Sequence, residues 1–143
     1  MSKRLEFKLK HPVHPFVARN KLNMFSSRVK EYHESQNKLR DLLKKMNLEP
    51  FTKKQQVKLS VLVVRAPVER PHATSKTGTA IWHPAKRSDL SNFIKAVEDA
   101  IQPRKTDKWH LIPNDSQIWR YGRCEKREGT SDVVHVVLEE IIE

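Results

Sequence analysis

Residues 86–99, KRSDLSNFIKAVED, carry the clearest amphipathic pattern in the chain. With about 100° of rotation per residue, the apolar residues fall on one arc of a helix and the polar residues on the opposite arc. The apolar arc consists of Leu90, Phe93, Ile94, Val97, Ala100 and Ile101, and the polar arc of Ser91, Asn92, Lys95, Glu98 and Asp99. The spacing predicts a helix over Asp89–Ile101 that packs its apolar arc on a core and stops before Pro103.

Charged residues of this helix and of a later segment suggest a reaction at a phosphate. Asp89 and Lys95 belong to the helix, and Asp115 follows in the segment Asn114-Asp115-Ser116-Gln117. Carboxylates bind hard cations such as Mg²⁺, and a lysine beside them neutralises a phosphate, as phosphodiester cleavage requires. The alternative interpretation is a surface helix with Asp89 as its N-cap.

Working outward, apolar periodicity predicts four strands and a second helix. The expected strands are Leu5–Lys10, Val57–Val64, Gln117–Arg123 and Asp132–Ile142, and the expected helix is Ser26–Met46. Val57–Val64 becomes continuously apolar and β-branched, which predicts a central strand covered on both faces. These elements together predict an α/β (α+β) fold, a single two-layer domain over residues 1–143 with a mixed four-stranded sheet and two main helices.

The helix Ser26–Met46 is expected to divide its residues between an apolar stripe and a basic outer face. The stripe consists of Val29, Tyr32, Gln36, Leu39, Leu42, Leu43 and Met46, and the outer face of Arg28, Lys30, Lys38, Arg40, Lys44 and Lys45. A solvated face and a surface that follows a nucleic-acid backbone both account for these charges. A polar stretch, Ala66–Ala85, predicts a long loop with a short extended piece at Ala80–Trp82. The tryptophans, including Trp109 and Trp119, are expected to belong partly to the core.

Composition indicates a polyanionic partner. The chain has 28 Lys+Arg and 17 Asp+Glu, a net charge of +11. Residues 1–58 hold 15 basic and 5 acidic side chains, whereas residues 59–143 hold 13 and 12. One half therefore resembles an electrostatic footprint for a nucleic acid. Charge does not separate an enzyme from a basic protein that binds RNA or ribosomes.

Other sequence features restrict the compartment and the chemistry. The single cysteine, Cys124, excludes an intramolecular disulfide and a cysteine-based zinc site. No apolar run approaches the roughly 20 residues of a membrane span, and residues 1–12 lack the apolar core of a signal peptide. We therefore expect an intracellular protein without a membrane partner. Cytoplasm or nucleoid, and for a eukaryotic source nucleus or mitochondrion, all stay open.

Two motifs carry a resemblance to a known family. The segments are Asp89-Leu90-Ser91-Asn92-Phe93-Ile94-Lys95 and Asn114-Asp115-Ser116-Gln117-Ile118. They resemble the Asp-x-Asp-Asn-x-x-Lys and Asp-Asp-Ser/Ala-Gln-Val/Ile motifs of RusA-type Holliday-junction resolvases, and the resemblance extends over nearly the whole chain. It implies a homodimeric, Mg²⁺-dependent endonuclease, with Mn²⁺ as an alternative ion, that cuts four-way DNA junctions symmetrically in recombination and repair.

Carried over position by position, the resemblance implies roles for individual residues. Asp89 and Asp115 are the implied metal carboxylates, and Lys95 is the implied third catalytic residue. Lys86, Arg87, Asn92 and Lys95 are expected to contact the nucleic acid.

Two acidic positions of the family pattern are altered. Ser91 replaces the second helix aspartate, and Asn114 replaces the first aspartate of the pair. Ser91 supplies at best a neutral oxygen to the metal, and such a site binds the ion more weakly. Two alternatives to the endonuclease therefore stay open. One is a catalytically impaired protein of the same fold that binds junction DNA, and the other is a basic RNA-binding protein.

Overall fold

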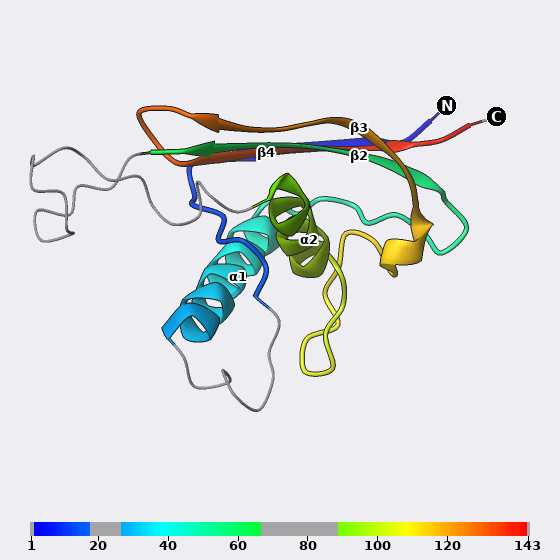
Figure 1. Cartoon of the computed structure of the whole chain (residues 1–143). Helices are drawn as coiled ribbons and strands as arrows, with labels where there is room; N and C mark the ends of the chain where they lie inside the picture. The colour runs from blue at the N-terminus through cyan, green and yellow to red at the C-terminus, as the bar shows by residue number, and fades with distance from the viewer. Residues whose placement is uncertain (1, 18–26, 67–88, 143) are drawn as a thin grey trace, which may run out of the picture.

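The computed structural model describes residues 2–17, 27–66 and 89–142, and these form one sheet with two helices packed on it (Figure 1). Along the chain the elements are β1 (Arg4–Leu9), α1 (Ser27–Lys45), β2 (Val57–Arg65), α2 (Leu90–Ile101), the short 3₁₀ helix η2 (Asp115–Gln117), β3 (Ile118–Glu128) and β4 (Val133–Glu140). The predicted fold class, a mixed four-stranded sheet with two helices, is confirmed. The assignment of all residues 1–143 to a single domain stays a prediction.

The sheet has the strand order β1-β4-β2-β3. β4 pairs antiparallel with both β1 and β2, whereas β3 lies parallel to β2 at one edge. Parallel neighbours need a crossover connection, and α2 lies within the one that joins β2 to β3. The residues that follow α2 therefore return to the edge strand, and this return places Asp115 directly before β3.

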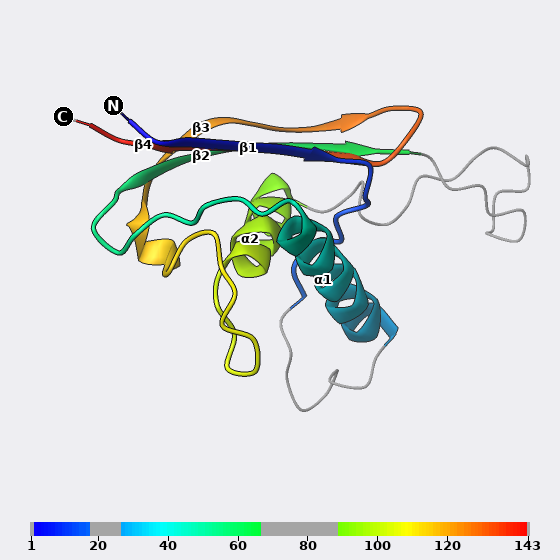
Figure 2. The same ribbon diagram turned by 180° about the vertical axis from the view of Figure 1, so that it is seen from behind.

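Both helices cover the same face of the sheet, as the two opposite views show (Figures 1 and 2). Buried and half-buried residues alternate along β2, with Val57, Leu59, Val61 and Val63 fully buried. Among the described residues the predicted cover on both faces of β2 is not found, since Lys58, Ser60, Leu62 and Val64 on its other face are only half-buried. Side chains of a strand point alternately to its two faces, and the described helices bury only one of them.

The predicted helical phase of α2 is confirmed. Phe93, Val97, Ala100 and Ile101 are at most 1% exposed and face the core. The inward stripe of α1 is also found, although Met46, just beyond its end, is 38% exposed. The polar arc of α2 is thereby directed away from the sheet, where Lys95 and its acidic neighbours remain accessible.

Arg40 departs from its predicted place on a solvated face of α1, since its side chain is only 1% exposed. Its guanidinium donates hydrogen bonds to the carbonyl oxygens of Ala100 (2.9 Å), Gln102 (2.5 Å), Asp107 (3.2 Å) and Trp109 (2.9 Å). The last four carbonyl oxygens of a helix have no N–H donor within the helix and need donors from elsewhere. Arg40 therefore fixes the end of α2 and the segment that leads from it toward Asp115.

The edge strand β3 runs five residues beyond its predicted end, through the charged residues up to Glu128. Its register against β2 shifts between Leu59 and Val61, which marks a bulge in the strand. A Cβ at Gly122 would lie 2.2 Å from Ser60 Oγ and 2.8 Å from Lys58 Cε, so any other residue here would require these two side chains to move.

Several predictions fall outside the described residues. These are the loop over Ala66–Ala85 beyond its first residue, the extended piece at Ala80–Trp82, and the nucleic-acid contacts Lys86 and Arg87. Neither of the two helices that the structure describes is long and apolar enough to cross a membrane.

Candidate active site

Asp89 occupies the N-cap position of α2, but its carboxylate accepts no capping hydrogen bond. The first turn is closed by the backbone alone, with the Asn92 N–H donating to the Asp89 carbonyl oxygen over 3.0 Å. The Asp89 side chain is exposed. The alternative interpretation of Asp89 as a helix cap therefore lacks the hydrogen bond that defines this role.

Asp115 lies at the other end of α2. Its backbone N–H donates to Gln102 Oε1 over 3.1 Å, and Gln102 is the residue directly after the helix. A helix of 12 residues is about 18 Å long. The structure thus attaches Asp89 and Asp115 at opposite ends of α2, and the sharing of one cation by their carboxylates stays a prediction.

The carboxylates that interact electrostatically with Asp115 are those of Glu98 and Asp99, on the polar arc of α2. We refer to Glu98, Asp99 and Asp115 as the acidic group. Burial raises the pKa of Glu98 and of Asp99, and the negative charge of Asp115 raises both further. The Lys95 ammonium acts in the opposite direction on both. The acidic group, in which Glu98 and Asp99 are half-buried, attracts positive charge. The single ammonium of Lys95 balances only part of the charge of three carboxylates.

Two tyrosines hold the carboxylates of the acidic group. Tyr32 Oη donates to Asp99 Oδ2 over 3.1 Å, and Tyr121 Oη donates to Glu98 Oε1 over 2.5 Å. Burial and the bond to Glu98 raise the pKa of Tyr121 to about 12, so the phenol stays a donor at neutral pH. Sequence analysis assigned Tyr32 to the apolar stripe of α1, and its bond to Asp99 depends on the packing of α1 beside α2.

Phe16 links Lys95, Tyr32 and the first turn of α2. Lys95 Nζ lies 4.1 Å from the centroid of the Phe16 ring, and this ring meets Tyr32 edge-on with centroids 5.8 Å apart. The Phe16 N–H donates to the Asn92 carbonyl oxygen over 3.0 Å. Sequence analysis missed this residue, for which the one local signal is an aromatic side chain directly after Pro15 in a segment without strand or helix pattern.

We expect the Phe16→Leu variant to lower turnover by about 5- to 20-fold with a smaller change in DNA affinity. Loss of a cation–π contact of about 1 kcal/mol or more frees the ammonium from its position beside the acidic group. Single-turnover cleavage and junction binding, measured on the same preparation, check this. Phe16→Tyr, which keeps the ring, is the control and should retain the parental rate. Equal losses in both variants would contradict a positioning role.

The side chains at the two altered family positions differ in their surroundings: one is used in a local hydrogen bond, and the other is exposed. Asn114 Oδ1 accepts a hydrogen bond from the Ser116 N–H over 2.8 Å and so caps η2. Ser91 is exposed on the first turn of α2, near Asp89 in sequence. Asn114 is thus committed to the local turn, while the Ser91 hydroxyl remains accessible beside Asp89.

The donor chemistry of these residues fits a hard cation, although residues 2–17, 27–66 and 89–142 contain no group of three or more His, Cys, Asp and Glu side chains placed to hold a metal ion. Mg²⁺ is commonly bound by only one or two protein carboxylates, with water and substrate phosphate completing its octahedron. Asp89 and Asp115 supply oxygen ligands of this kind. With Asp89 and Asp115 at opposite ends of α2, each carboxylate by itself leaves most of such an octahedron to water and substrate phosphate.

Exposed aromatic and basic residues continue from Asp115 along the edge strand. Trp119 is 66% exposed and Tyr121 54% exposed, so the prediction that Trp119 belongs partly to the core is wrong. Trp119 is the extra residue at the register shift between the pairs Val57–Ile118 and Lys58–Arg120, so no residue of β2 lies directly opposite it. Arg120 and Arg123 are exposed on the same strand. This combination suits contact with nucleic-acid bases and phosphates.

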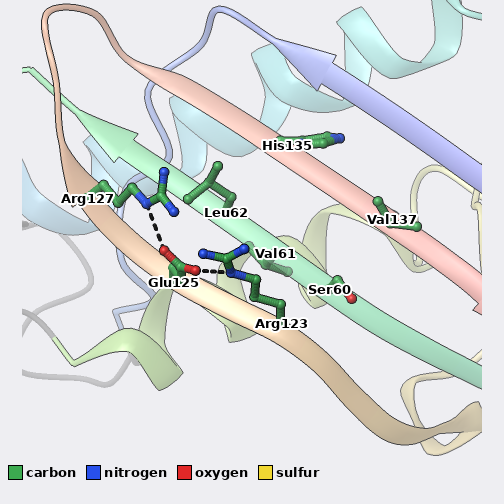
Figure 3. Close-up of a pocket in the computed structure, with 8 residues that line it drawn as sticks. All are labelled: Ser60, Val61, Leu62, Arg123, Glu125, Arg127, His135 and Val137. Carbon is green, nitrogen blue, oxygen red and sulfur yellow. Dashed lines mark hydrogen bonds and ion pairs between the residues drawn. The ribbon is translucent and has the colours of Figure 1, made fainter.

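A separate hollow of about 350 Å³ lies on the open face of the sheet (Figure 3). Arg123 and Arg127 flank Glu125 there, and Arg127 Nε donates to Glu125 Oε2 over 2.7 Å. Hydrogen bonds from Arg127 and Arg123 lower the pKa of Glu125. One carboxylate pairs with both arginines, so the two guanidinium groups exceed it by one positive charge. The hollow lies across the sheet from the helices that carry the acidic group.

Comparison with known proteins gives a family match over most of the chain. The family model described as endodeoxyribonuclease RusA matches residues 11–139. This range includes Phe16, all of α2, Asp115 and the whole of β3. No curated protein matches the chain.

Proposed function

The chain belongs to the RusA endodeoxyribonuclease family, and on this premise we propose that it is a Mg²⁺- or Mn²⁺-dependent endonuclease that cuts four-way DNA junctions in recombination and repair. The family itself indicates Holliday-junction resolvase activity and binds junction DNA. The observation that carries the proposal is the exposed polar arc of α2, where Asp89 is free of a capping bond and Lys95 is held beside the acidic group.

Nucleases of this family generally depend on a divalent metal ion. In this chain Asp89 and Asp115 are the proposed ligands, with Ser91 as a neutral oxygen near Asp89. Because Asp89 and the attachment point of Asp115 lie at opposite ends of α2, the two carboxylates share one ion only if DNA binding draws the segment of Asp115 toward the first turn of the helix. When bound, such an ion polarises the scissile phosphate and lowers the pKa of a water molecule. Lys95 would stabilise negative charge on the phosphate as it develops, since its ammonium is fixed in place by Phe16 and needs little reorganisation.

The DNA backbone would be bound by basic side chains of residues 1–58, a segment with a net charge of +10, other than the buried Arg40, together with Lys86 and Arg87. Asn92 and Lys95 would contact the phosphates nearest the reaction. Trp119 and Tyr121 offer exposed rings at the edge strand for bases near the branch.

The test is incubation of the purified protein with an end-labelled four-way junction, and with the duplex of one arm as control. We expect paired nicks in the junction with Mg²⁺ or Mn²⁺, none with EDTA, and an intact duplex. Junction binding without product in either metal would favour the catalytically impaired alternative. Preference for an RNA hairpin over both DNAs would contradict the proposal.

The impaired alternative rests on Ser91, and its replacement tests it. We expect Ser91→Asp to raise the single-turnover cleavage rate about tenfold or more at limiting Mg²⁺, because a second carboxylate on the first turn increases the ligand charge. Ser91→Asn, of equal size but neutral, is the matched control. An acid at a helix N-terminus also adds about 0.3–1 kcal/mol of stability, so both variants are compared well below their melting temperatures. An unchanged rate at every Mg²⁺ concentration would remove Ser91 from the metal site.

We further propose that the protein acts as a homodimer, because symmetrical cutting needs two active sites related by a two-fold axis. Sedimentation velocity at tens of micromolar should give a mass near twice that of the 16.8 kDa chain. A monomeric mass at this concentration, in a protein that still nicks the two strands of the junction at equal rates, would contradict the dimer.

A further inference from the structure

The face of the sheet opposite α1 and α2 (Figures 1 and 2), which we refer to as the open face, carries an excess of basic side chains. The buried residues of β1, β2 and β4 point to the helices, so the residues between them point to the open face. Pairing with β2 extends this face to β3, where Arg127 lies beside Val64. Its basic side chains are Arg4, Lys8, Lys58, Arg120, Arg123 and Arg127. Its acidic side chains are Glu6, Glu125 and Glu139, so positive charges exceed negative ones by three.

Arg123 and Arg127 keep donors available on the open face although both pair with Glu125 (Figure 3). The side chain of Arg123 is 78% exposed and that of Arg127 50% exposed, whereas that of Glu125 is 27% exposed. A guanidinium carries five N–H donors, and one carboxylate shared between two arginines accepts only some of them. An anion that approaches the open face therefore meets the guanidinium groups before the carboxylate.

The composition of the open face favours a partner that is bound through its phosphates. Arg and Lys side chains are typical contacts of phosphate oxygens. Beyond the start of β3, none of the described side chains on this face is Phe, Tyr or Trp, so unpaired bases find no ring to stack on. A second copy of the chain, packed face to face, would bring two positive excesses together. Duplex DNA instead offers about one negative charge per 1.7 Å of its axis.

β3 joins the open face to the proposed active site. The strand begins three residues after Asp115, and Arg127 lies near its other end. At about 3.3 Å per residue and with two register shifts, the strand from Ile118 to Arg127 is about 25–30 Å long, the length of about eight base pairs. A duplex that leaves a branch point near Asp115 and follows β3 would therefore reach Arg127 within its first helical turn.

We propose that the open face binds one duplex arm of the junction through its phosphate backbone, with Arg123 and Arg127 as the main contacts. The inference rests on the proposed function, since a four-way junction supplies the arm. The two faces of one protomer would then hold different arms, with β3 at the branch between them. A linear duplex would have to bend sharply to follow both faces, which gives a physical reason for a preference for branched DNA.

The first experiment measures binding of a four-way junction with arms of about 15 base pairs, in EDTA, over a series of salt concentrations. Arg127→Gln should weaken binding about three- to tenfold and lower the slope of log K against log salt by about 1, the contribution of one phosphate contact. Lys126→Gln is the matched control, because it removes the same charge from the adjacent residue, which lies beside Val63 on the helix face. It should change the affinity less than about twofold, whereas Glu125→Gln should tighten binding about two- to fivefold.

The second experiment locates the arm with neutral methylphosphonate linkages, placed one at a time along the DNA. In the parent protein they should weaken binding at about six to nine base pairs from the branch. In Arg127→Gln the same linkages should have no further effect, because the charge pair that they remove is already broken. A linear duplex should lose less than about twofold in affinity on this substitution, since it can bind at the other face.

Equal effects of Arg127→Gln and Lys126→Gln, equal losses for junction and linear duplex, or methylphosphonate effects that are the same in parent and variant would overturn the arm-binding face. A lower sedimentation mass of Arg123→Gln/Arg127→Gln without DNA would assign the open face to a second copy and contradict the proposal as well. Junction binding with all the expected effects, in a protein that cuts no junction with Mg²⁺ or Mn²⁺, would instead remove the proposed endonuclease activity alone.

Discussion

Asp89→Asn should reduce junction cleavage by at least about 100-fold while leaving junction binding intact or slightly tighter. The substitution keeps the shape of the side chain but removes a metal-binding charge, and stabilisation of the reacting phosphate typically contributes at least this factor. One negative charge fewer near the DNA backbone favours binding. Asp115→Asn should have the same effect. Single-turnover cleavage with saturating protein, together with a binding titration in EDTA, measures both quantities.

The matched control is Asp41→Asn, the same chemical change at an exposed position of α1. It should cleave at the parental rate. Glu98→Gln and Asp99→Asn complete the series, because the structure places these acids with Asp115 rather than with Asp89. A parental rate for Asp89→Asn combined with a large loss for Asp99→Asn would move the metal site to the acidic group and contradict the role of Asp89.

Arg40→Met should lower the free energy of unfolding by about 3–5 kcal/mol, because several carbonyl oxygens lose a buried donor and each buried acceptor left unsatisfied costs about 1–3 kcal/mol. The substitution leaves four carbonyls at and after the end of α2 without this donor. Asp107 loses the Arg40 guanidinium, 3.1 Å away, and keeps the Lys44 ammonium, 2.5 Å away. The cation–π contact between Arg40 and Trp109, 5.0 Å from guanidinium carbon to ring centroid, is also lost. Urea denaturation followed by circular dichroism measures the change.

Arg28→Met, at an exposed position on the first turn of the same helix, is the control and should stay within about 0.5 kcal/mol of the parent. Arg40→Lys should fall between the two, because it keeps the charge but loses the planar fork that reaches several carbonyls. A loss below about 1 kcal/mol for Arg40→Met would show that water replaces the guanidinium, and that Arg40 does not fix the segment before Asp115.

Local pattern was enough to predict α2 and the sheet. The apolar arc of α2 is buried as its periodicity requires, and the four predicted runs form the four strands. Their ends lie within two residues of the predicted ones, except that β3 extends five residues farther. β2 shows the limit of this reasoning. A continuous apolar run is compatible with burial on one or both faces, and only the placement of α1 and α2 on a single face decides between them.

The candidate site likewise contains residues that the local sequence predicted and residues that it did not. Asp89, Lys95 and Asp115 stood out by residue type and spacing, whereas Phe16 and Tyr121 did not, because a ring beside a lysine or a phenol beside a glutamate leaves no periodic trace in the chain. Residues 16 and 95, or 98 and 121, become neighbours only when the segments pack.

By itself the sequence determined the helical phase of α2, the strands and the acidic and basic residues available for chemistry, because these depend on neighbours a few positions away. The tertiary structure alone decided that Arg40 is buried, that Trp119 is exposed, and that Asp115 lies with Glu98 and Asp99 at the far end of α2 from Asp89. The physical reason is that burial and charge pairing depend on which surfaces meet, and a solvated arginine and a buried one that binds helix-end carbonyls have the same local sequence.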